Sequence, residues 1–134
     1  MKAYHVNRDA LIAELQAAGV RHNPDEILQI ARKLDGGIVF LETGNNRSGW
    51  QHILREHTED FANRGIYEDQ IQDVIMEAVT RGRIIGTQGV SRTFYEVKFN
   101  GLIQYISVSV SSNGYIVGAN PTRRRLIRRF TQEI

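Results

Sequence analysis

The sequence of 134 residues contains no cysteine and only two prolines. Without cysteine, neither a disulfide framework nor a thiolate metal site can form, and a reducing compartment suits the chain. No apolar run approaches the ~18 residues that a membrane-spanning helix needs, and the N-terminus lacks the apolar stretch of a signal peptide. Apolar residues make up 41% of the chain and charged residues 24%, a composition typical of a soluble globular domain.

The net charge of +2 conceals an uneven distribution. Five of the 17 basic residues lie in the segment RRRLIRR, residues 123–129, and one of the 15 acidic residues follows it, so residues 1–122 carry 12 basic against 14 acidic residues. A basic cluster attracts a phosphate backbone or an acidic protein. It is equally typical of a solubilising terminal segment in which Leu126, Ile127 and Phe130 pack, and the two interpretations are compatible.

Hydrophobic spacing predicts helices in the first part of the chain. A helix is predicted over 8–19, ending at Gly19. The segment PDEILQIARKLDGG places Pro24 at a first helical position, acids in the first turn and glycines at the end, so a second helix is predicted over 24–37. The run IVFLE that follows, residues 38–42, is typical of a short strand.

The rest of the chain changes from helical to alternating spacing. Helices are predicted over 49–61, with Ser48 as N-cap, and over 67–82. Four later segments, RIIGTQG, TFYEVKF, LIQYISVSV and GYIVGAN, are typical of strands, and two Asn-Gly pairs are hairpin turn signals. The order predicts an α+β domain in which N-terminal helices pack on a meander of about four antiparallel strands. A soft boundary separates an N-terminal helical segment, 1–36, from the remainder, 37–134.

Two histidines stand out in the helical segment GWQHILREHTEDF. At 100° per residue, His57 falls in the apolar stripe with Ile53 and Phe61, and His52 lies on the other side. A histidine in an apolar stripe is more often a hydrogen-bonded core residue than a catalyst. Zinc-binding helices space histidines four apart, whereas this spacing of five turns the rings about 140° apart, so no metal site is expected. Core residue and acid/base group stay open as alternatives.

The predicted strands add polar groups. In LIQYISVSV, Tyr105, Ser107 and Ser109 share one face, which in a simple sheet would be solvated. The neighbouring segment SRTFYEVKF contributes a set of cationic and hydroxyl side chains: Arg92, Thr93, Tyr95 and Lys98. Cations, hydroxyl donors and an imidazole suit metal-free RNA cleavage, in which the 2′-hydroxyl attacks its own phosphodiester and the enzyme supplies acid, base and donors to the phosphorane. Histidine titrates near ~6.5, and the arginine fork matches two phosphate oxygens.

Residues 39–121 also resemble a known family. The motifs HILREH, DFANRGI, FNG and NGYIVGANP together are similar to the C-terminal toxin domains of contact-dependent growth inhibition (CdiA-type) proteins. Such domains resemble the barnase/EndoU/colicin/RelE superfamily, in which helices precede a four- or five-stranded antiparallel sheet. The resemblance implies ribonuclease activity, often on tRNA, without a cofactor.

The resemblance implies roles for particular residues. The resemblance implies catalytic roles for His52, His57, Arg92, Tyr95 and Ser109. We expect substrate binding by Thr93, Lys98, Asn120, Arg123 and Arg124, and no metal ligand. His57 is favoured as the principal acid/base group if the apolar stripe opens onto the cleft, with His52 binding phosphate, but the assignment of acid and base stays open.

The resemblance also implies partners and location. The toxin domain would be delivered from a cell-surface carrier protein into the cytoplasm of a target cell and neutralised by a cognate immunity protein. Residues 1–36 would then be either a remnant of an entry region or an integral helical layer of the nuclease. The alternative function is a non-catalytic module that binds nucleic acid or protein through the arginine-rich tail.

Overall fold

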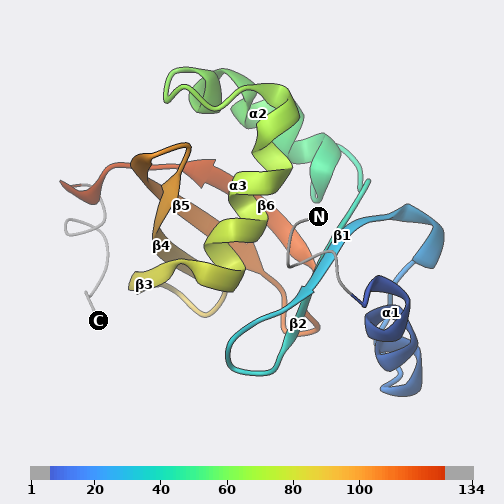
Figure 1. The fold of residues 1–134 in the computed structure, drawn as a ribbon. Helices are drawn as coiled ribbons and strands as arrows, with labels where there is room; N and C mark the ends of the chain where they lie inside the picture. Colours follow the sequence, from blue (N-terminus) through green and yellow to red (C-terminus); the bar gives the residue numbers. More distant parts are fainter. Residues whose placement is uncertain (1–6, 126–134) are drawn as a thin grey trace.

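The structure, a computed structural model, describes residues 7–125 and is an α+β fold (Figure 1). Within this range it contains three α-helices, a two-stranded and a four-stranded antiparallel sheet. In chain order the elements are α1 (Arg8–Ala17), a 3-10 turn η2 (Pro24–Glu26), β1 (Ile27–Arg32), β2 (Ile38–Glu42), α2 (Trp50–Ala62), α3 (Glu68–Arg81), β3 (Arg83–Gln88), β4 (Arg92–Phe99), β5 (Leu102–Val110) and β6 (Ile116–Pro121).

The prediction of a helix over 24–37 is wrong. Only the 3-10 turn forms there, and β1 then pairs antiparallel with β2. The core of β2, residues 39–41, is fully buried, so its backbone needs a hydrogen-bonding partner strand. That long-range pairing outweighs the local helix signals, which are weak by comparison. The expected boundary at residues 36 and 37 lies in the turn of this hairpin.

The predicted antiparallel meander is confirmed. The larger sheet has the order β3-β4-β5-β6, with every neighbouring pair antiparallel. Asn100 and Gly101 turn between β4 and β5 with φ of 53° and 79°, the left-handed values that a tight type I′ hairpin requires. The smaller sheet joins this one where Phe40 of β2 forms a parallel bridge with Tyr115, just before β6.

The main core lies between the four-stranded sheet and the helices α2 and α3, which cover one face of it (Figure 1). Ile53 and Phe61 from α2 and Ile75 from α3 are fully buried against Ile106 and Val108 of β5. A second, smaller core joins α1 to the β1–β2 hairpin through Leu11, Leu15, Ile27, Ile30 and Phe40. The first helix therefore packs on the hairpin, beside the larger sheet.

The start of α2 differs from its prediction. Ser48 is not the N-cap: Gly49 precedes the helix with φ of 82° and makes no side-chain cap. The Ser48 hydroxyl instead hydrogen-bonds the Tyr115 hydroxyl at 2.9 Å. A Cβ at Gly49 would lie 2.8 Å from that Tyr115 oxygen, so the loop passes too close to the β5–β6 turn for any larger residue.

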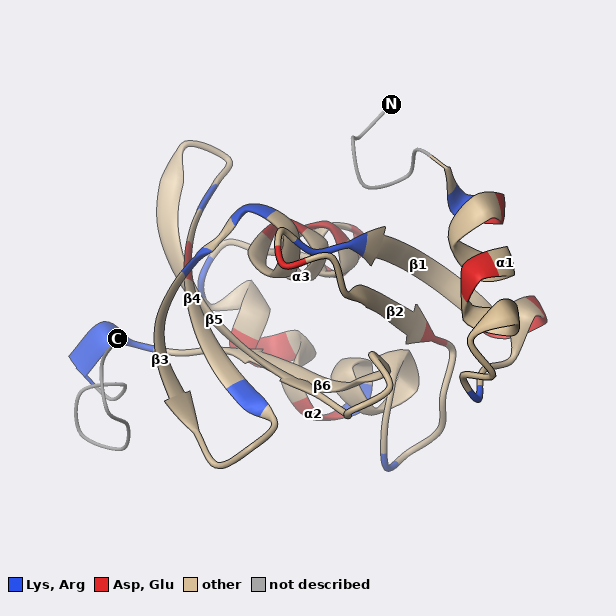
Figure 2. Ribbon diagram, turned by 90° about the horizontal axis from the view of Figure 1, so that it is seen from below, with Lys and Arg blue, Asp and Glu red and all other residues tan. Residues whose placement is uncertain are grey.

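Charge is distributed unevenly over the fold. Figure 2 shows acidic segments on α1, α2 and α3, and basic segments on β4 and at residues 123–125. The remainder of the basic tail, including Leu126, Ile127 and Phe130, lies outside the described residues, so its predicted packing stays a prediction. In the range 7–125 no helix has the length and apolarity needed to cross a bilayer.

Candidate active site

The candidate site lies on the face of the four-stranded sheet that α2 and α3 do not cover. Residues paired across antiparallel strands point to the same face. Arg92 of β4 pairs with Ser109 of β5, and Ser109 pairs with Gly118 of β6. We call these three residues the Arg92–Gly118 row. The next row on this face consists of Phe94, Ser107 and Asn120.

Arg92 is held on this face by neutral groups only. Its Nη1 donates to Gln88 Oε1 at 2.8 Å, and its Nη2 donates to Ser107 Oγ at 3.2 Å and Asn120 Oδ1 at 3.4 Å. The guanidinium carbon lies 4.8 Å from the centre of the Phe94 ring. Among residues 7–125 no carboxylate forms an ion pair with it.

This environment favours an incoming anion. Partial burial lowers the pKa of Arg92 from its usual value, but arginine titrates so high that the group stays charged at neutral pH. An arginine has five N–H donors, and three are used here, so donors remain for a ligand. A desolvated cation with uncharged partners gains most from a negatively charged ligand such as phosphate.

His52 reaches the same face from the first turn of α2. A Cβ placed at Gly118 would lie 3.6 Å from His52 Cδ2 and 3.7 Å from Nε2. The other ring nitrogen, Nδ1, lies 3.1 Å from the backbone oxygen of Asn46. Because a carbonyl only accepts, Nδ1 carries the proton and Nε2 is left with a lone pair in the neutral ring. The loop before α2 thereby orients the nitrogen that lies against the row.

His57 lies one further turn along α2. Its Nδ1 is 2.9 Å from Asp60 Oδ2, and the centre of its ring is 6.3 Å from that of His52, with the planes at 86°. Its side chain is 27% exposed, so it is neither a core histidine nor fully solvated. Of the two rings, His52 is the one seen against β6, whereas the sequence interpretation favoured His57.

The two key side chains come close on the surface of β6. The Arg92 guanidinium reaches Asn120, and the His52 ring covers Gly118. These two β6 residues are two positions apart on one face, which corresponds to about 6–7 Å along a strand. Imidazole and guanidinium therefore converge on one small area of the sheet, with the partly exposed Ser109 beside it.

Two residues predicted for the site lie on the other face. Tyr95 and Thr93 are an odd number of positions from Arg92, so they point towards the helices. Tyr95 is only 7% exposed and belongs to the main core. Burial raises its pKa, an effect that a hydrogen bond with Thr93 partly opposes. The structure therefore separates these two predicted site residues from Arg92, because neighbours along a strand point in opposite directions.

The other predicted binding residues are spread along the sheet. Asn120 lies in the site and accepts from Ser107 Oγ at 2.7 Å. Lys98 shares the face of Arg92 but is six residues away, about 20 Å along β4. Arg124 lies 3.7 Å from Glu96, a residue that also pairs with Arg83 at 3.1 Å. Arg123 is exposed beside them.

Three residues of the site were not among the predicted ones. Gln88 and Ser107 hold the Arg92 guanidinium, and Gly118 makes the space that His52 occupies. The alternation of β5 already placed Ser107 on the polar face. A glycine inside a strand indicates close approach of another group, so the sequence also indicated that a side chain would lie against Gly118.

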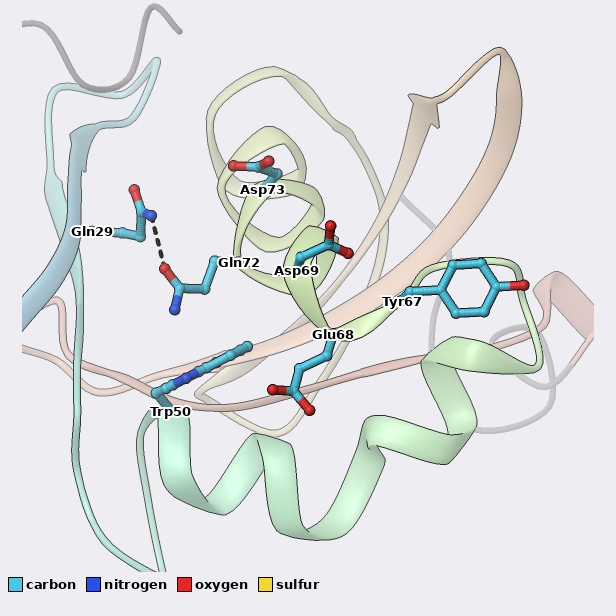
Figure 3. Close-up of a pocket in the computed structure, with 7 residues that line it drawn as sticks. All are labelled: Gln29, Trp50, Tyr67, Glu68, Asp69, Gln72 and Asp73. Carbon is cyan, nitrogen blue, oxygen red and sulfur yellow. Dashed lines mark hydrogen bonds between the residues drawn. The ribbon is translucent and has the colours of Figure 1, made fainter.

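A separate cavity of about 620 Å³ lies where β1, α2 and α3 meet (Figure 3). Trp50 lines it beside the hydrogen-bonded pair Gln29 and Gln72, whose amide groups are 2.8 Å apart. Its remaining lining residues are Tyr67, Glu68, Asp69 and Asp73. Three carboxylates would repel a phosphate, so this cavity does not suit an RNA backbone.

In the part of the chain that the structure describes, no group of three or more His, Asp or Glu side chains is placed to hold a metal ion. The chain matches no protein-family model and none of the curated proteins with which it was compared.

Proposed function

We propose that this protein is an endoribonuclease that cleaves RNA by internal transesterification at the Arg92–Gly118 row. The observation that carries the proposal is the convergence of two side chains on β6: the His52 ring lies against Gly118, and the Arg92 guanidinium reaches Asn120. An imidazole and an uncompensated cation at this separation suit one phosphodiester lying across the sheet face.

The reaction needs no outside nucleophile. The 2′-oxygen of the ribose attacks phosphorus while the bond from phosphorus to the 5′-oxygen breaks. A base takes the proton of the 2′-hydroxyl, and an acid gives a proton to the departing 5′-oxygen. The products are a 2′,3′-cyclic phosphate and a 5′-hydroxyl, which identify this route chemically.

The site offers a group for each role. His52 presents Nε2 towards the row and is the principal acid/base group in this proposal. His57, with its ring 6.3 Å away, is the second imidazole available for the opposite proton transfer. Arg92 and the Ser109 hydroxyl donate to the phosphorane oxygens, where preorganised donors are most effective.

The family resemblance extends the proposal to the biological setting. We propose tRNA as the RNA that is cut, a cognate immunity protein as the inhibitor, and delivery from a cell-surface carrier into the cytoplasm of a target cell. The arginines 123–125, together with the Arg83 and Arg124 side chains around Glu96, would hold RNA beyond the scissile phosphate.

The test is RNA cleavage by His52→Ala and Arg92→Ala, with Arg32→Ala, at an exposed arginine that pairs with Glu14, as the control. Loss of general acid–base catalysis typically costs about 10²–10⁴-fold in rate, the loss expected for His52→Ala. Loss of one preorganised donor costs about 10²–10³-fold, the loss expected for Arg92→Ala, and the control should change little. Sequencing of the RNA ends should find 2′,3′-cyclic phosphates. Unchanged rates in both variants, or tRNA left intact by the wild type, would contradict the proposal.

The second candidate function is a non-catalytic binding module. The observation that favours it is the exposure of Arg123 and Arg125 at the end of β6, where cations can contact a phosphate backbone or an acidic protein without any catalytic group. In that case the arginines, and not His52, would determine all measurable activity.

A further inference from the structure

The sheet face that carries the candidate site also carries every charged side chain of the strands β3 to β6. These side chains are Arg83, Arg92, Glu96 and Lys98. Glu96 is the one carboxylate among them, and each of its oxygens already faces an arginine: Oε1 lies 3.1 Å from Arg83 and Oε2 lies 3.7 Å from Arg124. The basic character of this face therefore extends along the strands beyond the Arg92–Gly118 row.

Two apolar side chains lie within this basic surface. Tyr105 of β5 pairs with Glu96 of β4, and its ring packs against the cluster that contains Phe94 while remaining only partly buried. Ile103 is two positions away on the same face, pairs with Lys98 and is 53% exposed. We call Tyr105 and Ile103 the Tyr105 platform.

The surroundings of the platform indicate the ligand. Lys98 lies beside Ile103, and the two arginines that face Glu96 lie beside Tyr105. An aromatic ring framed by cations is the arrangement that holds a single-stranded nucleic acid, because the bases stack on the ring and the phosphates bind the cations. Covering the exposed isoleucine adds a hydrophobic gain. The carboxylates of an acidic protein would satisfy the cations alone.

The platform also lies in line with the proposed cleavage site. Tyr105 is four residues from Ser109 on the same face of one strand, about 13 Å along β5. An RNA strand that is bound at the Arg92–Gly118 row and follows β5 therefore brings a base over the Tyr105 ring. In a duplex both faces of a base are covered by its neighbours, so only an unpaired base can stack on a side chain.

We propose that Tyr105, with Ile103 beside it, stacks an unpaired base of the RNA substrate, so that the protein cuts RNA within single-stranded regions. The inference rests on the proposed ribonuclease function for its biological meaning. Stacking itself can be measured without cleavage, and the two ideas can therefore fail separately.

The test is binding of a short single-stranded RNA with a 2′-O-methyl group on every ribose, which leaves no 2′-hydroxyl to attack the phosphodiester. Tyr105→Leu keeps an apolar side chain on the cluster but removes the planar ring. It should bind about 5–150-fold more weakly, which corresponds to the loss of about 1–3 kcal/mol for one stacked base. Tyr105→Phe keeps the ring and should bind like the wild type. Tyr67→Leu, at a tyrosine that is exposed in the acidic cavity, is the matched control and should not change binding.

Two further measurements locate the stacked base. Abasic positions introduced one at a time should weaken wild-type binding most at one position, and at that position they should have no additional effect in Tyr105→Leu. Annealing the complementary strand should remove the difference between the wild type and Tyr105→Leu. Ile103→Glu changes an exposed side chain, so it tests the platform by weakened binding even if Tyr105→Leu does not fold. Thermal melts establish which variants are folded.

The outcomes separate the inference from the proposed function. Wild-type affinity in folded Tyr105→Leu, or an equal loss at every abasic position, overturns the platform even if RNA is cleaved. Binding of poly-L-glutamate that falls in Tyr105→Leu as much as RNA binding does indicates an acidic protein partner and overturns it as well. Ring-dependent binding of single-stranded RNA by a protein that cuts no RNA supports the platform and overturns the ribonuclease instead.

Discussion

The imidazole of His52 covers the backbone of Gly118 closely enough that an added methyl group would touch it, at 3.6 Å from Cδ2 and 3.7 Å from Nε2. This contact places a helix-borne ring on the sheet face that also carries Arg92. Gly118 adopts an ordinary negative-φ backbone. A glycine suits this position because it leaves space for the His52 ring, and not because of its conformational freedom.

Substitution of Gly118 should therefore depend on size. Gly118→Ala places a methyl group at ordinary contact distance, so we expect near-normal RNA cleavage and unchanged stability. Gly118→Leu should fill the area between His52 and Ser109 and lower cleavage on the order of 10²-fold, the scale expected when reacting groups are displaced. Rates on one RNA substrate, with melting curves for both variants, check this. A Leu variant that is folded and fully active would show that RNA does not occupy the row.

The basic residues at the end of β6 should contribute affinity and not catalysis. For Arg123→Ala/Arg124→Ala, the slope of log affinity against log salt should fall by about 1.4–1.8, since each phosphate contact contributes about 0.7–0.9. Arg32→Ala, which breaks the exposed ion pair with Glu14 on the β1–β2 hairpin, serves as the matched charge control. Filter binding of tRNA between low and physiological salt measures the slope.

The same double variant separates the two candidate functions. A ribonuclease should still cleave a dinucleotide substrate at the wild-type rate, because the dinucleotide does not extend to residues 123 and 124. Complete loss of every activity would favour the binding module.

Much of the fold follows from local signals. The alternating segments after residue 82 and the Asn-Gly turn at residue 100 act over a few residues, and the meander needs only neighbouring pairings. β1 could not be predicted in this way, because the proline and acids before it and the glycines after it are genuine helix signals. Its strand conformation comes from pairing with β2, which only the assembled core specifies.

Part of the candidate site could also be predicted from local sequence patterns. The residue types at His52, Arg92 and Ser109 indicated phosphate chemistry, and strand alternation alone separates Arg92 from Tyr95. Helical periodicity placed His52 and His57 on different faces of α2 but could not say which face meets β6. That depends on how the helix packs against the sheet, where Gly118 leaves room for one ring.

Tyr95 should make stability depend on alkaline pH. Burial raises its pKa above the ordinary value of 10, so above pH ~10 the unfolded chain loses this proton while the folded chain keeps it. The unfolded state then binds fewer protons, and the free energy of unfolding falls as pH rises, by at most about 1.4 kcal/mol per pH unit for one group. Urea unfolding from pH 9 to 11 should show a shallower fall for Tyr95→Phe. Tyr67 is 61% exposed, so Tyr67→Phe should show the same fall in the free energy of unfolding with pH as the wild type. The same fall in all three proteins would contradict the burial argument.

Two glycines with left-handed backbones should differ sharply in their tolerance of alanine. Gly101 has φ of 79° and open space around it, so Gly101→Ala should cost only the left-handed conformation, about 1–2 kcal/mol. Gly114 has φ of 95°, and a Cβ there would lie 2.1 Å from the backbone oxygen of Ile38. Its own carbonyl also accepts from Phe40 N at 2.9 Å, so the β2–β6 junction must open to make room.

We expect Gly114→Ala to cost about 3 kcal/mol or more, because strain from overpacking adds to the conformational cost. Urea unfolding of both variants measures the difference, and equal destabilisation would mean that the contact between β2 and the β5–β6 turn is looser than the structure shows.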